Sequence, residues 1–99
     1  MPYEIEWTVN AMEDVAELFD YLAENASLWD ANYVTERILQ STDKLADFPR
    51  LYEADERYGI GVRRISLLGQ YVLYEVDDTE QRVAVLSVVG QRQNPRSIR

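Results

Sequence analysis

The chain has 99 residues, 46% of them hydrophobic, so we expect a single domain, residues 1–99, with one modest core. It contains neither histidine nor cysteine, which excludes Ser-His-Asp and Cys-His catalysis, the common zinc sites and disulfide bonds, so we expect no metal and no cofactor. The net charge of −8 argues against a protein that grips nucleic acid through a generally basic surface.

The charge is unevenly distributed along the chain. Residues 1–48 hold eleven acidic residues against Arg37 and Lys44, whereas residues 49–99 hold seven acidic residues against eight arginines. An acidic half therefore adjoins a nearly neutral half that is rich in arginine. No apolar run approaches the roughly 20 residues that span a bilayer, and the N-terminus lacks a charged-then-apolar export segment, so we expect a cytoplasmic protein without a membrane partner.

The first two predicted elements are a strand and a helix. Residues 3–8 alternate apolar and polar side chains, which predicts a half-buried strand. Asn10, followed by Glu13, predicts a helix N-cap with a capping box. Apolar residues then recur at helical spacing, and the opposite face is acidic. The apolar positions are Ala11, Val15, Leu18 and Leu22, and the acidic positions are Glu13, Glu17, Asp20 and Glu24.

A second helix follows the break at residues 25–27. Ser27 is its predicted N-cap, with Asp30 at the third position, and the helix must end before Pro49. The short join predicts an antiparallel helical hairpin. The predicted buried stripe consists of Ala31, Val34, Ile38, Thr42 and Leu45.

Three strands are predicted after Pro49. Residues 62–68 and 71–76 flank a predicted two-residue turn at Gly69 and Gln70, a register that places Arg64 opposite Glu75. One face of this hairpin would hold Ile65, Leu67, Val72, Tyr74 and Val76, with Arg63 at its end. After a turn at residues 77–81, residues 83–89 form a strand that is apolar on both faces, which is typical of a central strand. The order β-α-α-β-β-β predicts an α+β fold, with a helical hairpin packed on a mostly antiparallel sheet.

Two aromatic residues of the second helix are candidates for a binding surface. Trp29 and Tyr33 lie opposite the predicted buried stripe, one turn apart. Exposed aromatic side chains in such a pair indicate a partner surface. The alternative is that they pack against the first helix or against residues 51–52, and the sequence leaves both interpretations open.

The arginines of the second half are candidates for a phosphate-binding or target-binding cluster. These are Arg57, Arg63, Arg64, Arg92 and Arg96. The alternative is scattered surface charge together with a cross-strand pair between Arg64 and Glu75.

Several short stretches in order resemble one known family over nearly the whole chain. They are Trp7-Thr8 with Ala11 and Asp14-Val15, Tyr21-Leu22-Ala23 with Asn25, Leu45 and Pro49, Gly61-Val62-Arg63, Tyr71-Val72-Leu73-Tyr74-Glu75-Val76, and Val85 to Val89 followed by Gly90-Gln91-Arg92. The chain resembles the RelE/ParE superfamily of toxins from bacterial type II toxin–antitoxin systems. The resemblance implies the RelE/ParE-like fold and a cognate antitoxin as partner, in a toxin–antitoxin hetero-oligomer.

The chain departs from the mRNA-cleaving branch of that superfamily. Gly90 stands where those members frequently have a histidine, and the chain has no tyrosine after Tyr74. Arg63 and Arg92 remain as candidate catalytic residues of a nuclease, but arginine stays protonated and is a poor general base. The resemblance therefore favours the ParE-like branch, which binds and blocks DNA gyrase without catalysis of its own.

Three functional hypotheses follow. The first is a ParE-like toxin that inhibits growth by binding DNA gyrase and is neutralised by an antitoxin, which the resemblance leads us to expect near Trp29 and Tyr33 of the hairpin and along the sheet. The second is a RelE-like, ribosome-dependent mRNA endonuclease, which would be an enzyme with ribosome and mRNA as partners. The third is a non-toxic protein-binding module of the same fold.

Overall fold

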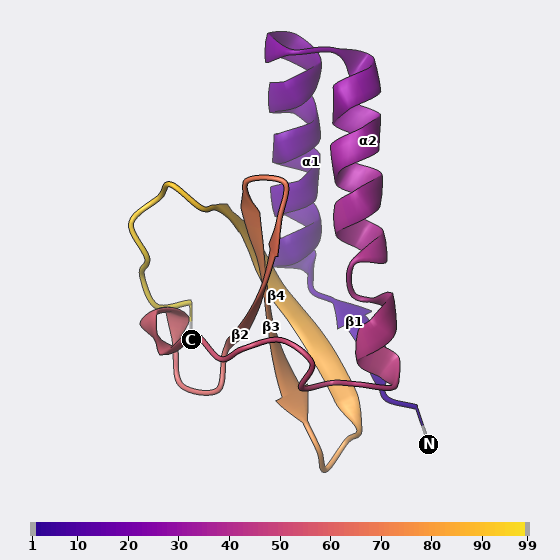
Figure 1. Ribbon diagram of the computed structural model, residues 1–99, viewed down its shortest axis with the longest axis vertical. Coiled ribbons are helices and arrows are strands. Elements are labelled where there is room, and N and C mark those ends of the chain that lie inside the picture. Colours follow the sequence, from indigo (N-terminus) through magenta and orange to yellow (C-terminus); the bar gives the residue numbers. More distant parts are fainter. Residues whose placement is uncertain (1, 99) are drawn as a thin grey trace.

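A computed structural model describes residues 2–98. Its element order confirms the predicted β-α-α-β-β-β arrangement (Figure 1). The helices and strands are β1 (Glu4–Trp7), α1 (Val9–Asn25), α2 (Leu28–Gln40), β2 (Arg63–Leu67), β3 (Gln70–Asp77) and β4 (Arg82–Gly90), with short 3-10 helices η1 (Asp43–Ala46) and η2 (Glu56–Tyr58).

The strands form one sheet in the order β1-β4-β3-β2. β1 pairs with β4 in parallel, and the other neighbours are antiparallel. β4 is therefore central, as its two apolar faces predicted. α1 and α2 run side by side as an antiparallel hairpin, joined by the short connection between Asn25 and Leu28 (Figure 1). The predicted α+β fold is confirmed.

The turn between β2 and β3 differs from the prediction. The turn residues are Leu68 and Gly69, with φ of 50° and 80°, the two positive φ values that a type I′ turn requires. Arg64 consequently lies opposite Leu73 rather than Glu75, so the predicted Arg64–Glu75 pair is wrong. The partner of each β2 residue moves by two positions, and an even shift keeps every side chain on its predicted face.

The N-cap of α1 also differs from the prediction, whereas that of α2 is confirmed. Thr8 caps α1, because its hydroxyl accepts the N–H of Ala11 and donates to the carbonyl of Val85 (2.8 Å). The Asn10 side chain instead donates to the carbonyl of Leu86 (2.9 Å). Ser27 caps α2 by accepting the N–H of Asp30 (2.9 Å).

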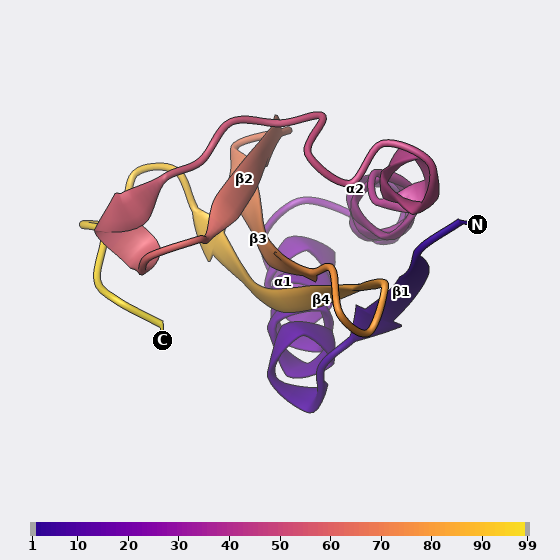
Figure 2. The ribbon, with the colours of Figure 1, turned by 90° about the horizontal axis from the view of Figure 1, so that it is seen from below.

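The main core lies between the helical hairpin and one face of the sheet. Its buried residues are Ala11, Val15, Ile38, Leu45, Ile65, Val72, Tyr74, Val83, Val85 and Val88. A smaller cluster lies on the other face of the sheet and comprises Tyr58, Val62 and Leu73, with Ile98 packed against it. The segment around η2 and the C-terminal tail therefore cover β3 on the side that the helices leave uncovered (Figure 2).

The molecule is elongated, with extents of 42 × 28 × 21 Å. The helical hairpin causes this shape, because the connected ends of α1 and α2 extend beyond the sheet (Figure 1). Within residues 2–98, no helix combines the length and the apolar character needed to cross a membrane.

Candidate binding surfaces

Trp29 and Tyr33 form an exposed aromatic stack on α2. Their rings are parallel within 7°, with centroids 5.1 Å apart, and the residues are 69% and 40% exposed. The guanidinium of Arg37 lies 5.5 Å from the Tyr33 ring centroid and donates a hydrogen bond to the Tyr33 hydroxyl (2.7 Å). The two aromatic rings therefore pack on each other and on Arg37, and they leave a broad apolar area open to solvent.

Other exposed apolar residues lie at the same end of the hairpin. Tyr21 near the end of α1 and Leu28 at the start of α2 are both more than 60% exposed. Large exposed apolar patches on soluble proteins commonly mark interaction sites. The protruding end of the hairpin, defined here by Tyr21, Leu28, Trp29 and Tyr33, is therefore a candidate protein-binding surface.

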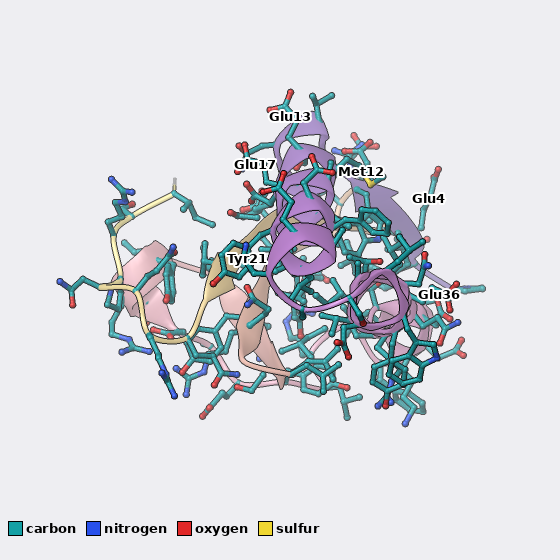
Figure 3. All side chains as sticks on the ribbon, turned by 90° about the horizontal axis from the view of Figure 1, so that it is seen from above. Glu4, Met12, Glu13, Glu17, Tyr21 and Glu36 are labelled. Atoms are coloured by element: carbon teal, nitrogen blue, oxygen red, sulfur yellow. The ribbon has the colours of Figure 1, made fainter. Side chains whose placement is uncertain are left out.

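The outward face of α1 is acidic. Glu13 and Glu17 point away from the sheet, and Figure 3 shows both along one side of α1. Asp14, on the flank of this face, contacts β4, where its Oδ2 accepts hydrogen bonds from the Ser87 hydroxyl (2.6 Å) and the Val88 N–H (2.9 Å). Asp14 thus fastens α1 to the central strand, while its acidic neighbours remain solvated.

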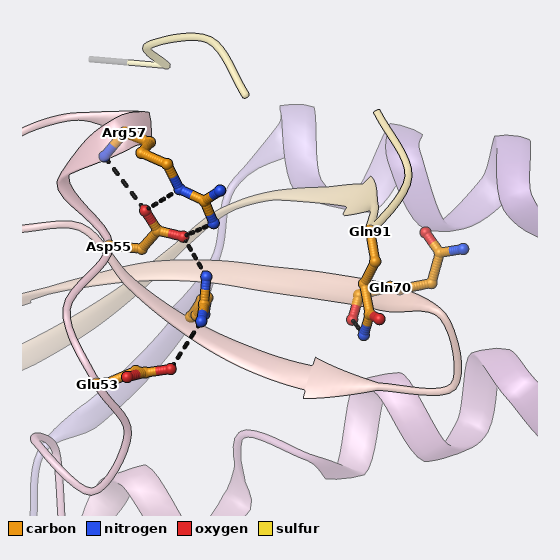
Figure 4. Close-up of polar contacts among 6 residues, drawn as sticks. Glu53, Asp55, Arg57, Gln70 and Gln91 are labelled. Atoms are coloured by element: carbon orange, nitrogen blue, oxygen red, sulfur yellow. Dashed lines mark hydrogen bonds and ion pairs between the residues drawn. The ribbon is translucent and has the colours of Figure 1, made fainter. Parts of the chain in front are cut away.

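Two of the five predicted arginines meet at one buried carboxylate. Arg57 binds Asp55 in a bidentate manner, with Nε 2.8 Å from Oδ1 and Nη2 2.6 Å from Oδ2 (Figure 4). Arg64 donates to Asp55 Oδ2 (2.6 Å) and to Glu53 Oε1 (2.8 Å), and its guanidinium lies 4.9 Å from the Tyr71 ring centroid. Each guanidinium thus donates two side-chain hydrogen bonds to acidic partners, while the buried Nε of Arg64 has no hydrogen-bond partner in the described part of the chain.

This network strongly lowers the pKa of the Asp55 carboxyl. Hydrogen bonds from Arg57, and then from Arg64, hold the pKa of the Asp55 carboxyl well below its ordinary value of 3.8, although burial opposes the shift. Hydrogen bonds with Asp55 in turn raise the pKa of Arg57. Asp55 and its two arginine partners are accordingly ion-paired near neutral pH.

Arg63 lies apart from this cluster. Successive strand residues point to opposite faces, so Arg63 is on the face of Ile65, which is the helix side, whereas Arg64 is on the other face. The Arg63 guanidinium donates to the carbonyl of Tyr52 (2.7 Å). This contact ties the loop after η1 to the beginning of β2.

Arg92 and Arg96 lie in the exposed tail after β4. The tail is held at its start because the Gln91 side chain donates to the carbonyl of Gln70 (Figure 4) and the Gln91 N–H donates to that of Gly69. It is held at its end because the Ile98 N–H donates to the Tyr58 carbonyl (2.8 Å). Arg96 lines a cavity of about 580 Å³ between this tail and α1. Within residues 2–98, neither arginine is in an ion pair.

The sequence prediction missed Asp55, the residue that organises the arginine half. Its only sequence signal is the pattern Glu53, Asp55 and Arg57 before a strand, which is no more specific than a charged loop. Residues 2–98 contain no group of three or more histidine, cysteine or acidic residues arranged to hold a metal ion.

One comparison with known proteins shows a family, and the others show the fold. A family model described as the ParE toxin of the type II toxin–antitoxin system parDE matches residues 5–95. A chain of the chromosomal ParDE toxin–antitoxin system from P. aeruginosa has a similar fold, with a TM-score of 0.77 and 16% identity over 89% of this chain and 95% of that chain. No sequence in a search of curated proteins matches.

Two RelBE structures are also similar. The RelBE2 toxin–antitoxin complex from Mycobacterium tuberculosis gives a TM-score of 0.66 and 19% identity, over 92% of this chain and 100% of that chain. The intact E. coli RelBE complex gives the same TM-score and identity, over 92% and 99% of the two chains. At 16–19% identity, these similarities concern the fold alone.

Proposed function

The chain belongs to the ParE toxin family of type II toxin–antitoxin systems, and on that premise we propose that it stops bacterial growth by binding DNA gyrase in the cytoplasm. A cognate antitoxin neutralises it by binding directly. The observation that carries the proposal is that, among the described residues, the arginines of this ParE family member have no neighbouring general base of the kind that a nuclease needs. The guanidinium groups of Arg57 and Arg64 are ion-paired to Asp55, and the chain has no histidine.

The arrangement of Arg63 and Arg92 argues against the nuclease alternative. Arg63 pairs with Tyr74 in the sheet, and Gly90, two residues before Arg92, pairs with Gln70. Four residues of β3 separate these positions, which is about 13 Å along the strand. The Arg63 guanidinium is in addition bound to the carbonyl of Tyr52 (2.7 Å), so a phosphate site shared with Arg92 would require Arg63 to leave that contact.

We assign target contact first to Arg92 and Arg96, since both are exposed and neither is in an ion pair within residues 2–98. Arg57, Arg63 and Arg64 already hold internal contacts with Asp55, Glu53 or Tyr52, and a target that displaced these contacts would have to replace them. Exchanging an internal ion pair for an external one yields little net free energy. Antitoxin contact is assigned to the protruding end of the hairpin around Trp29 and Tyr33.

Pulse labelling of DNA and protein synthesis during induced expression, without antitoxin, tests the proposal. DNA synthesis failing first, with DNA-damage signalling, supports gyrase as the target. Protein synthesis failing first, with translation-dependent mRNA cuts, supports the nuclease instead. Unchanged growth at a confirmed level of folded protein supports a non-toxic binding module.

A further inference from the structure

A cavity of about 580 Å³ lies between α1, the end of β4 and the C-terminal tail. The tail is a fixed wall because it is anchored on both sides. The Gln91 N–H donates to the carbonyl of Gly69, and the Ile98 N–H donates to that of Tyr58. Between these anchors the tail arches away from β4 and returns toward η2 (Figure 1). A cavity of this size suits a small molecule or a short peptide.

The α1 wall of the cavity carries a polar stripe. Its members lie three or four residues apart, on one side of the helix, and are Asn10, Asp14, Glu17 and Tyr21. The Asp14 carboxylate is held in position because its Oδ2 accepts two hydrogen bonds from β4, and within residues 2–98 no hydrogen bond reaches its Oδ1. Glu17 projects on the side of α1 where the tail lies, and its side chain contacts no donor in the described chain (Figure 3). This wall therefore presents two carboxylates with unused acceptor capacity.

The tail wall carries the opposite charge. Arg96 lines the cavity, and its guanidinium forms no ion pair with any residue that the structure describes. Gln93 and Asn94 also line the cavity, and their side-chain amides both donate and accept hydrogen bonds. Because no ion pair joins Glu17 to Arg96 in the described structure, opposite charges line one cavity without neutralising each other.

A buried hydroxyl at this cavity also lacks a partner. Tyr58 lines the cavity and is only 3% exposed, and its hydroxyl makes no hydrogen bond to another described residue. Burial raises the pKa of Tyr58, so the hydroxyl keeps its proton and can donate it to an acceptor. Buried polar groups in folded proteins are nearly always hydrogen-bonded, so an unpaired hydroxyl beside a cavity indicates that a polar partner is missing. Leu18, Val88 and Ile98 add apolar surface to the same cavity.

We propose that this cavity binds a small zwitterion with an apolar side chain, either an amino acid or a short peptide with both ends free. Its ammonium group lies against Asp14 and Glu17, and its carboxylate lies against Arg96. Each charge of the ligand thus meets the opposite charge on one wall. The apolar side chain packs on Leu18 and Val88, and the ligand supplies the acceptor that the Tyr58 hydroxyl lacks. This inference goes beyond the proposed function, because neither gyrase nor the antitoxin takes part in the binding.

Ligands with one kind of charge fit the cavity less well. The carboxylates of Asp14 and Glu17 repel a phosphate group, whereas the guanidinium of Arg96 repels a polyamine. A neutral apolar molecule would cover these charged groups without pairing them, which is unfavourable. A zwitterion is the class of ligand that pairs both walls at once.

Titration of the isotopically labelled chain, followed by amide chemical shifts, tests the proposal. The probes are free L-leucine and the tripeptide alanyl-leucyl-alanine, which share the charged ends and distinguish an amino acid from a peptide. The acetylated form of each probe lacks the ammonium group. Glu17→Gln and Arg96→Gln each remove one charge from the cavity. Glu13→Gln, on the same helix, and Arg82→Gln, at the start of β4, are the matched controls, since neither position lines the cavity.

We expect one of the two probes to bind with a Kd of about 1 mM or lower and to shift the amides of residues 87–90 and of the tail. Glu17→Gln and Arg96→Gln should each raise Kd at least about fivefold, and the controls should change Kd by less than about twofold. Acetylation should weaken binding to the unmodified chain at least about fivefold but add little in Glu17→Gln, because both changes remove the same contact. A purely structural role of Glu17 would not produce this coupling. Circular dichroism checks that each variant folds.

Three results would overturn the inference. The first is that neither probe shifts an amide at concentrations up to about 10 mM. The second is that the acetylated probe binds the unmodified chain as tightly as the free one, which would mean that the carboxylates do not recognise the ammonium group. The third is that the shifted amides lie only outside the cavity. None of these results affects the proposed action on gyrase, since the titration contains the chain and the probe alone.

Discussion

Asp55 shows how a single buried residue controls the charge of the arginine half. It is only 6% exposed and accepts hydrogen bonds from two guanidinium groups. Both arginines were predicted as members of a candidate cluster in the arginine half, but their common partner was not. The partnership depends on the path of the loop from Glu53 to Val62, and charge spacing alone does not determine that path.

The first prediction concerns the stability supplied by this carboxylate. Asp55→Asn should lower the free energy of unfolding by about 2–3 kcal/mol at neutral pH, because Arg57 and Arg64 lose the buried negative charge with which both are paired. Glu53→Gln is the matched control and should cost under about 1 kcal/mol, since the Glu53 side chain is 71% exposed. Urea unfolding measures both. Equal losses in the two variants would show that burial of Asp55 has no special role.

The second prediction concerns pH. The pKa of Asp55 is depressed in the folded chain, so its contribution is fully present above its ordinary pKa of 3.8 and is lost as pH falls toward the folded value. The unfolding free energies of the unmodified chain and of Asp55→Asn should therefore converge as pH falls from about 5 to about 2. Unfolding curves recorded across that range test this. A difference that stays constant would mean that Asp55 remains uncharged or unpaired in the folded chain.

At the scale of elements, the periodicity of apolar residues predicted the helices and strands well. The residues at which helices and turns begin were predicted less well. The buried stripes and the central position of β4 follow from the spacing of apolar residues. That pattern is repeated along a whole helix or strand and so does not depend on any single residue. The N-cap of α1 depends on one hydrogen bond, and Thr8 and Asn10 are both good capping residues. Thr8 caps the helix because its hydroxyl also reaches the carbonyl of Val85, a contact that only the parallel pairing of β1 with β4 creates.

The third prediction follows from that cap. Thr8→Ala should destabilise the chain by about 1–2 kcal/mol, because it removes both the cap and the contact with β4. Asn10→Ala should cost under about 1 kcal/mol, since its one hydrogen bond to Leu86 is exposed. Thermal unfolding of the two variants compares them directly. A larger loss of stability in Asn10→Ala than in Thr8→Ala would mean that Asn10, and not Thr8, is the N-cap that stabilises α1.

The fourth prediction concerns the exposed face of α2. Helical spacing placed Trp29 and Tyr33 opposite the core, and the structure confirms that both are exposed. Trp29→Ala should weaken antitoxin binding at least about tenfold while leaving stability nearly unchanged, because an exposed aromatic anchor contributes mainly to binding. Tyr21→Ala, at an exposed aromatic residue of α1, tests the extent of the surface. Unchanged affinity in Trp29→Ala would remove the stack from the antitoxin interface.

For the whole molecule, the order of the predicted elements was enough to predict the fold, because each strand and helix has a clear periodicity of its own. The binding surfaces were less predictable. A groove between α2 and β2 joins residues that are more than twenty positions apart, and only the folded chain brings Lys44 beside Ser66. The fold places the acidic face of α1 and a groove without carboxylates on the same small protein. The net charge of the chain does not reveal that these two surfaces differ in charge.

The central claim is that this chain inhibits DNA gyrase, and a supercoiling assay with purified components tests it most directly. Gyrase, ATP and relaxed plasmid are incubated with increasing amounts of the chain. We predict that supercoiling falls as the chain is added and recovers when purified antitoxin is included. Supercoiling at an undiminished rate in the presence of a molar excess of folded, antitoxin-binding chain would contradict the account.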